Sequence, residues 1–175
     1  ASAAAAAPAP TLASVAAAAP ADAGGGCRTA WGAGGTPAAL APYGFQAKDE
    51  DTWEPDAPLP KVLLRVVAHD EIRGHTRYLL SCTISSSGRG ALEWDTTKRL
   101  AHLRGNVHDF AKRELGEEYE RYFERTPFAH RFAPRGTTAR LDAWCQTLAS
   151  CMSAGLLSPV ATAQLLRFLE APSPT

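Results

Sequence analysis

The sequence predicts an α+β domain in which a three-stranded antiparallel β-meander packs against a bundle of three or more helices. Two observations support this fold class. Between residues 61 and 97, short runs of apolar, β-branched and aromatic residues are separated by turn residues, which is typical of strands. From Lys98 onwards, apolar residues recur every three or four positions, which is typical of amphipathic helices. A block of strands followed by a block of helices indicates an α+β domain.

The three expected strands follow one another closely. Residues 62–69 begin with the branched apolar run VLLRVV and predict a well-buried strand. Residues 76–85 predict a second strand, and the short link around Gly74 makes the pair a hairpin. After a turn rich in serine and glycine, residues 91–97 predict the third strand. Tyr78, Leu80 and Cys82 are expected to lie in the core, together with Trp94 and Trp144 on their own elements.

The helical region is expected to contain three main helices. The first spans residues 98–115 and is interrupted at Gly105, where Asn106 is a candidate N-cap for a second segment. A short amphipathic stretch follows at residues 117–123. The second long helix is predicted at residues 138–153, and the third at residues 159–170. Ser158 followed by a proline is a typical start for that last helix.

The N-terminal part of the chain has a different composition. Residues 1–57 are expected to form a disordered tail rich in Ala, Gly and Pro, ending in an acidic linker, and the domain is expected at residues 58–171. Large apolar side chains are rare in the tail. Burial of so few of them does not offset a backbone ordering entropy of about 1–2 kcal/mol per residue. Trp53 is a candidate anchor where the linker meets the domain.

Composition and charge narrow the function classes. The chain has 175 residues and a mass of 18.6 kDa, and its 18 basic residues balance its 18 acidic ones. A neutral chain is not a general polyanion binder, so a nucleic-acid partner is not expected. The charges are nevertheless uneven, because 16 of the basic residues follow position 60. The four cysteines form no CxxC pair, which predicts reduced thiols in a cytoplasmic protein rather than a disulfide framework or zinc site.

An enzyme is the weakest hypothesis from these residues. The sequence contains no nucleophile elbow, P-loop, dinucleotide-binding or zinc-protease motif, so no catalytic residue, metal or cofactor is expected. The remaining catalytic alternative is an enzyme that uses Cys82 or a histidine in a cleft. A cysteine inside an apolar strand is far more often a core thiol.

Basic residues suggest a binding site instead. Lys98 and Arg99 lie where the last strand meets the first helix, Arg135 lies in a proline-containing loop, and Arg140 opens the second long helix. If these side chains converge, they form a phosphate site, because guanidinium groups match phosphate oxygens and a helix N-terminus adds donors. The alternative is that they are scattered surface charges that only favour solubility.

The order of several short motifs resembles the PX (phox homology) family of phosphoinositide-binding domains. The resemblance covers about residues 61–171. Its matching segments are residues 74–78 (GHTRY), residues 94–103 (WDTTKRLAHL against the family pattern WxxxRRYxxF), residues 132–135 (FAPR against FPPK), Arg140 and residues 168–169 (FL). The resemblance implies the PX-like form of the fold class predicted above.

The resemblance also implies roles for individual residues. Arg99 takes the place of the arginine that holds the 3-phosphate, with Lys98 beside it, and Arg135 takes the place of the lysine that contacts the 1-phosphate. Arg140 takes the place of the arginine that holds the 4- and 5-positions of the inositol ring, and Leu100 replaces the aromatic residue that packs against the ring. The implied ligand is phosphatidylinositol 3-phosphate, and the implied location is peripheral on endosomal membranes.

Two departures from the family pattern affect the expected mode of binding. Leu100 cannot stack on the inositol ring, and Pro134 lies only six residues before Arg140, which leaves little room for a membrane-inserting loop. Phe128 and Phe132 are expected to pack that loop against the core. Membrane binding is therefore expected to rest on electrostatics, and the alternative function is a PX-fold protein-interaction domain that has lost strong lipid binding.

Overall fold

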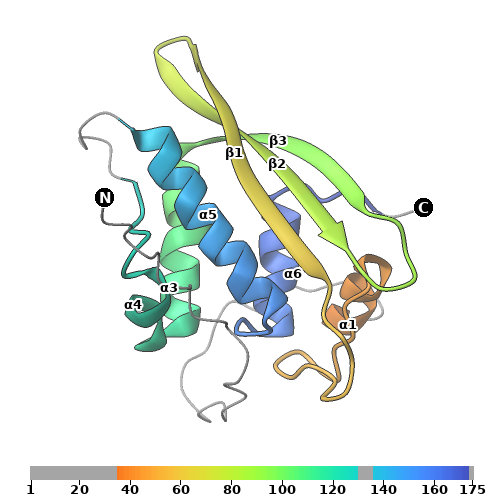
Figure 1. The fold of residues 1–175 in the computed structure, drawn as a ribbon. Helices are drawn as coiled ribbons and strands as arrows, with labels where there is room; N and C mark the ends of the chain where they lie inside the picture. Colours follow the sequence, from red (N-terminus) through yellow and green to blue (C-terminus); the bar gives the residue numbers. More distant parts are fainter. Residues whose placement is uncertain (1–34, 130–135, 174–175) are drawn as a thin grey trace, which may run out of the picture.

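The computed structural model describes residues 35–129 and 136–173, and it shows an α+β domain (Figure 1). The three strands come first, after a short helical segment, and the remaining helices follow. The elements are α1 (Gly35–Leu40), the 3-10 turn η1 (Ala41–Tyr43), β1 (Lys61–Ile72), β2 (His75–Ser85), β3 (Leu92–Arg99), α2 (Leu100–Leu103), the π-helical turn η2 (Arg104–His108), α3 (Asp109–Leu115), α4 (Glu118–Phe123), α5 (Thr137–Ser153) and α6 (Pro159–Phe168).

The sheet is the predicted meander. Its strand order is β1-β2-β3, and both neighbouring pairs are antiparallel. The register places Leu64 opposite Cys82 and Cys82 opposite Trp94. A bulge between Val66 and Ala68 interrupts the pairing of β1 with β2. Helices cover one face of the sheet, and α5 packs along β1 (Figure 1).

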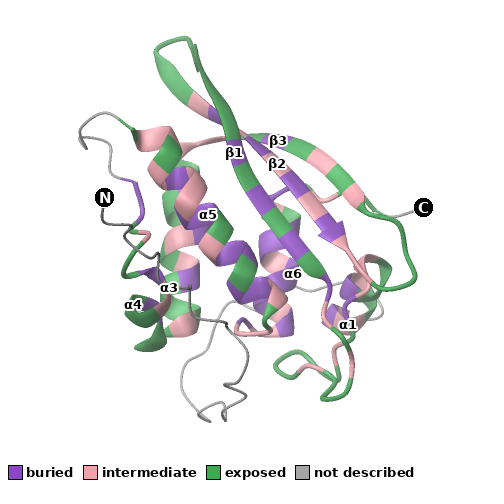
Figure 2. Ribbon diagram, viewed as in Figure 1, coloured by how far each residue is buried: buried purple, intermediate pink, exposed green. Residues whose placement is uncertain are grey.

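The core lies between that face and the helices. Every second residue of β1 from Val62 to Val66 is buried, and β2 follows the same alternation from Tyr78 to Ile84 (Figure 2). The period of two places these side chains on one face, as expected for a half-covered sheet. The predicted core positions Tyr78, Leu80, Cys82 and Trp144 are confirmed, because none is more than 5% exposed.

The change from strand to helix occurs two residues later than the sequence predicted, because β3 continues through Arg99 and α2 begins at Leu100. The interruption at Gly105 also differs from the predicted break between two helical segments. Asn106 does not start a new helix as an N-cap; its side-chain amide donates to the carbonyl of His102 at 3.1 Å. The helix passes through the π-helical turn η2 instead and continues directly into α3.

Residues 35–57 lie on the domain rather than forming part of a tail. Leu40 and Phe45 are 0% and 1% exposed, and both belong to the main core cluster. The indole N–H of Trp53 donates to the carbonyl of Leu157 at 2.8 Å, so Trp53 is the anchor that the sequence suggested. Part of the predicted tail and linker thus packs on the domain, N-terminal to the boundary expected at residue 58. Residues 1–34 lie outside the described residues.

Helix α5 also covers the outer edge of β1. The side-chain hydroxyl of Ser153 accepts a hydrogen bond from the backbone N–H of Val62, and a carboxylate oxygen of Asp142 accepts one from the N–H of Val66, each at 2.8 Å. Asp142 also accepts two hydrogen bonds from the guanidinium of Arg65, at 2.9 and 3.1 Å. These contacts satisfy backbone groups that an edge strand otherwise presents to other chains.

The stability of the domain is expected to depend on pH through Asp142. Burial alone would raise the pKa of Asp142, but hydrogen bonds from Arg65 and from the Val66 N–H outweigh burial, so the pKa lies below its ordinary value. A lowered folded-state pKa contributes stability that is fully present above the ordinary aspartate pKa of about 3.9 and is lost as the pH falls through the folded-state value. Asp142→Asn should therefore be less stable than wild type at neutral pH, and this difference should shrink in acid.

Urea unfolding from neutral to acid pH measures this effect. Asp142→Ala also removes the acceptor for the Val66 N–H, and that backbone hydrogen bond should account for about 1 kcal/mol of lost unfolding free energy. The exposed carboxylate of Asp56 gives the matched control, because Asp56→Asn removes the same charge outside any such contact. A difference between Asp142→Asn and wild type that stays constant across this pH range would contradict the assignment.

Candidate anion-binding site

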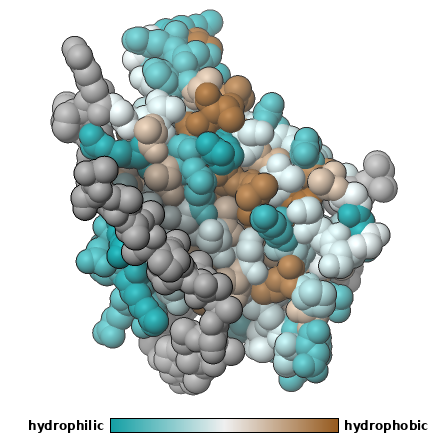
Figure 3. Space-filling view, viewed as in Figure 1, coloured by the Kyte–Doolittle hydropathy of each residue, from teal (hydrophilic) through white to brown (hydrophobic). Residues whose placement is uncertain are grey.

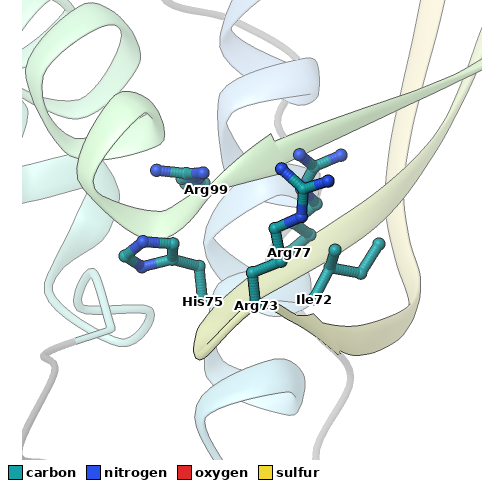
Figure 4. A pocket seen from close by; sticks show the side chains of 5 residues that line it. All are labelled: Ile72, Arg73, His75, Arg77 and Arg99. Carbon is teal, nitrogen blue, oxygen red and sulfur yellow. The ribbon is translucent and has the colours of Figure 1, made fainter.

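A hollow of about 490 Å³ lies where the end of β3 meets the turn between β1 and β2 (Figure 4). It is open to solvent on one side. Five side chains line it, and three of them are arginines: Ile72, Arg73, His75, Arg77 and Arg99. No carboxylate is among the lining residues, so the hollow favours an anion.

The turn that builds one wall is tighter than the sequence suggested. Ile72 pairs directly with His75, which leaves a turn of only two residues. Arg73 and Gly74 both have positive φ, at 52° and 71°, as a type I′ hairpin turn requires. Glycine adopts this conformation without strain, whereas a residue with a Cβ atom at φ > 0 costs about 1–2 kcal/mol. The strands consequently extend to Ile72 and from His75, further than predicted.

The hairpin projects beyond the body of the domain. All residues of β1 from Val67 to Ile72 are exposed, and so are residues 73–76 at the turn. Figures 1 and 2 show this part of the hairpin standing clear of the helices. The hollow therefore lies along the side of a solvent-exposed arm, between its turn and the end of β3, where a large partner has room to approach.

The strand pairing explains why the arginines meet. His75 and Arg77 are two residues apart on β2, so they lie on the same face of the sheet. Arg77 pairs with Arg99 of β3 on one side and with Asp70 of β1 on the other. This face is opposite to the one that the helices cover, because Tyr78, the residue after Arg77, is buried in the core. Asp70 is the one carboxylate of this row of three residues, so the row stays net positive.

Arg99 is the predicted site residue that the structure places in the hollow. Its neighbour Lys98 points to the opposite face, because adjacent residues of a strand alternate. The ammonium group of Lys98 lies 2.7 Å from a carboxylate oxygen of Glu170 and 5.0 Å from the centre of the Phe168 ring. With its side chain only 11% exposed, Lys98 stabilises the fold instead of lining this hollow.

The other predicted residues have different positions. Leu100 is the first residue of α2 and packs, half-buried, against the core. Arg140 lies in the first turn of α5, where its backbone N–H donates to the carbonyl of Gly136, and it is not among the residues lining the hollow. Arg135 and Phe132 lie outside the described residues. The convergence of Arg99, Arg135 and Arg140 therefore stays a prediction, whereas Phe128 is buried in the core, as expected.

Sequence reasoning missed Arg73, His75 and Arg77 as site residues. A pattern was present, because basic side chains recur at every second position around Gly74, and this period places such residues on one face of a strand. Which residue of the neighbouring strand lies beside these side chains was not predictable. Only the register of β2 with β3 brings Arg99 to Arg77, and a shift of one residue would have brought Lys98 there instead.

Cys82 does not form a second site. Its side chain is 0% exposed, and burial, together with the nearby charge of Asp95, raises its pKa to about 12. A thiol in this setting stays protonated and is a poor nucleophile. The expectation that Cys82 is a core thiol is confirmed, and Cys82 lacks the exposure that a nucleophile in a cleft requires.

Two further findings bear on function. No helix in residues 35–129 and 136–173 combines the length and the apolar character needed to cross a membrane. Comparisons of the chain with protein-family models, with curated proteins and with solved structures find no match. The fold and the hollow together define an α+β domain with an arginine-lined surface site.

Proposed function

We propose that this domain binds the phosphorylated headgroup of a phosphoinositide, phosphatidylinositol 3-phosphate in particular, and thereby attaches its protein to endosomal membranes. The observation that supports this proposal most strongly is the grouping of Arg73, Arg77 and Arg99 around one open hollow. Guanidinium groups donate paired hydrogen bonds to phosphate oxygens, and such charge-assisted bonds are about twice as strong as neutral ones.

The location of the hollow suits a ligand that projects from a membrane surface. The exposed arm carries Ile72 beside the turn, and this side chain is 41% exposed. An apolar side chain next to basic ones is suited to the boundary between lipid headgroups and acyl chains, where it can be buried while the cations contact phosphates. The short spacing before Arg140 leaves little room for a membrane-contacting loop. Under this proposal, the β1–β2 arm contacts the membrane in its place.

The resemblance to PX domains supports the same proposal from the sequence. A three-stranded meander followed by helices is the architecture that the resemblance implies, and Arg99 occupies the position assigned to the 3-phosphate. Under this proposal, Arg135 and Arg140 complete the site from the loop before α5 and from its first turn. Arg73 and Arg77 are contributions from the hairpin that the family pattern did not indicate.

A PX-like protein-interaction domain is the second candidate function, and one observation favours it. Leu63 and Val67 of β1 are 45% and 56% exposed. Figure 3 shows hydrophobic surface along the line of β1. Exposed apolar side chains grouped on one strand are typical of protein contacts. This candidate predicts that the domain binds a protein with Leu63 and Val67 in the interface and that Arg99 is dispensable.

Sedimentation with liposomes tests the proposed function. Vesicles with phosphatidylinositol 3-phosphate in a background of phosphatidylserine should bind the domain, whereas neutral vesicles should not. Each basic residue near an anionic surface contributes about 1 kcal/mol, and salt screens it over a Debye length of about 8–10 Å. Binding should therefore fall steeply from low to moderate salt and weaken without phosphatidylserine. Absence of binding to every phosphoinositide at low salt would overturn the proposal, and tight binding that ignores salt would overturn its electrostatic basis.

A further inference from the structure

The two edges of the sheet differ in whether other parts of the domain bond to them. Side chains of α5 bond to the outer edge of β1 at Val62 and Val66. β3 pairs with β2 on one side, and no hydrogen bond from another part of the described residues reaches backbone groups on its other side. An unpaired strand edge presents a row of N–H and C=O groups that another strand can pair with.

The direction of the backbone groups on β3 follows from β1. The N–H groups of Val62 and Val66 point away from β2, so the odd-numbered residues before the bulge are the ones that bond to β2. These residues pair with odd-numbered residues of β2, which therefore bond to β1. Because the N–H and C=O groups of successive residues point to opposite sides of a strand, the even-numbered residues of β2 bond to β3. On β3 this leaves Glu93, Asp95 and Thr97 with N–H and C=O groups directed to the open edge.

The side chains along this edge are self-complementary in charge. On the face away from the core, β3 carries Glu93 and Asp95 in its first half and Arg99 at its end, and Thr97 lies between them. An identical strand running antiparallel, with Thr96 at the centre, places each Glu93 opposite Arg99 of the second copy. The same arrangement places Asp95 opposite Thr97. All the outward backbone groups then face one another in pairs, as an antiparallel ladder requires.

We propose that β3 is a homodimer edge, at which two copies of this chain pair β3 with β3 in an antiparallel manner and form one continuous six-stranded sheet. Such a contact is isologous, so each Glu93–Arg99 pair occurs twice. A shift of two residues in one direction places Asp95 opposite Asp95, which is repulsive. A shift in the other direction places Asp95 opposite Arg99 but pairs fewer residues of β3 and leaves Glu93 outside the paired segment. Charge thus excludes the first shift, and the longer pairing favours the register with Glu93 opposite Arg99.

The oligomeric state of the full chain in solution tests this proposal. Sedimentation equilibrium over a series of concentrations should show a species of twice the 18.6 kDa chain mass. Glu93→Arg and Arg99→Glu each turn two attractive pairs into two repulsive ones, and each should raise the dissociation constant about tenfold or more. The double variant Glu93→Arg/Arg99→Glu restores opposite charges and should recover most of the dimer. Lys61→Glu, at the far end of β1, is the control and should leave the dimer unchanged.

A backbone variant supplies a second measurement. Thr97→Pro removes an outward N–H without removing a hydrogen bond to β2, so it should abolish the dimer while the far-ultraviolet circular dichroism spectrum stays that of wild type. A wild-type chain that stays monomeric into the millimolar range would overturn the proposal. A dimer that the single charge reversals leave intact, or that the double variant fails to recover, would equally overturn it. Lipid binding is not part of the readout, and Glu93→Arg alters the dimer edge without changing a residue that lines the hollow, so failure here is distinct from failure of the proposed function.

Discussion

Replacing Arg99 by alanine is expected to lower the affinity of the domain for vesicles containing phosphatidylinositol 3-phosphate by ten- to a hundredfold. A charge-assisted contact with a phosphate contributes about 1.5–3 kcal/mol, and about 1.4 kcal/mol corresponds to a tenfold change in affinity. Arg99→Lys keeps the charge but loses the paired donors, so it should give a partial defect. Arg99 lies on the face away from the core, and the urea midpoint of both variants should stay close to wild type. Sedimentation over a lipid titration measures the affinity.

The same titration separates the hollow from a general effect of charge. Lys61→Ala removes one positive charge from the exposed first residue of β1, at the opposite end of the sheet, and should change the affinity little. Arg77→Ala should weaken binding as Arg99→Ala does, because both residues line the hollow. Arg140→Ala tests the role that the PX resemblance assigns to α5. Arg99→Ala with unchanged affinity would refute its role in holding phosphate.

Replacing Phe45 by alanine is expected to lower the free energy of unfolding by about 3–5 kcal/mol, as truncations of fully buried phenylalanines do. Phe45 is 1% exposed, and its ring centre lies 5.5 Å from that of Trp53. Its loss leaves a cavity between residues 35–57 and the main core. Urea unfolding monitored by circular dichroism measures the change, and Gln46→Ala is the exposed control next to it.

This second prediction also decides where the domain begins. If Phe45→Ala unfolds at the same urea concentration as wild type, then residues 35–57 contribute little to folding and the boundary expected near residue 58 holds. If the predicted loss is observed, a chain that starts at residue 58 should be destabilised to at least the same extent. Such a chain lacks Leu40, Phe45 and Trp53 together, and each of them packs on the core.

The regular elements were predictable because their local patterns and their tertiary environment agree. The apolar run at 62–67 lies in a half-covered sheet, and the helical period after Lys98 matches helices whose one side faces that sheet. Residues 35–57 were not predictable in the same way. Their average composition indicates disorder, yet Leu40, Phe45 and Trp53 pack on the core, and composition does not reveal that the core has room for these three side chains.

The candidate site was predictable only in part. A motif located Arg99, but the remaining lining residues depend on two facts that no local pattern gives. One is that Arg73 adopts a left-handed conformation and so tightens the turn to two residues. The other is the register that sets Arg77 opposite Arg99. Lys98 shows the converse, because its place in the motif suggested a ligand contact, whereas its position on the strand directs it to Glu170.

The exposed arm of β1 and β2 has a consequence for the dynamics of the domain. Beyond Val66 its two strands are held by backbone hydrogen bonds and little buried surface, so this part of the hairpin is able to open without unfolding the core. Its amide protons should then exchange with solvent by local fraying, while those of residues 62–66 exchange through rarer, larger openings. An anion bridging Arg73 and Arg77 to Arg99 would couple the arm to β3. Ligand binding would thus slow amide hydrogen exchange in the arm, a segment that few buried contacts stabilise in the free domain.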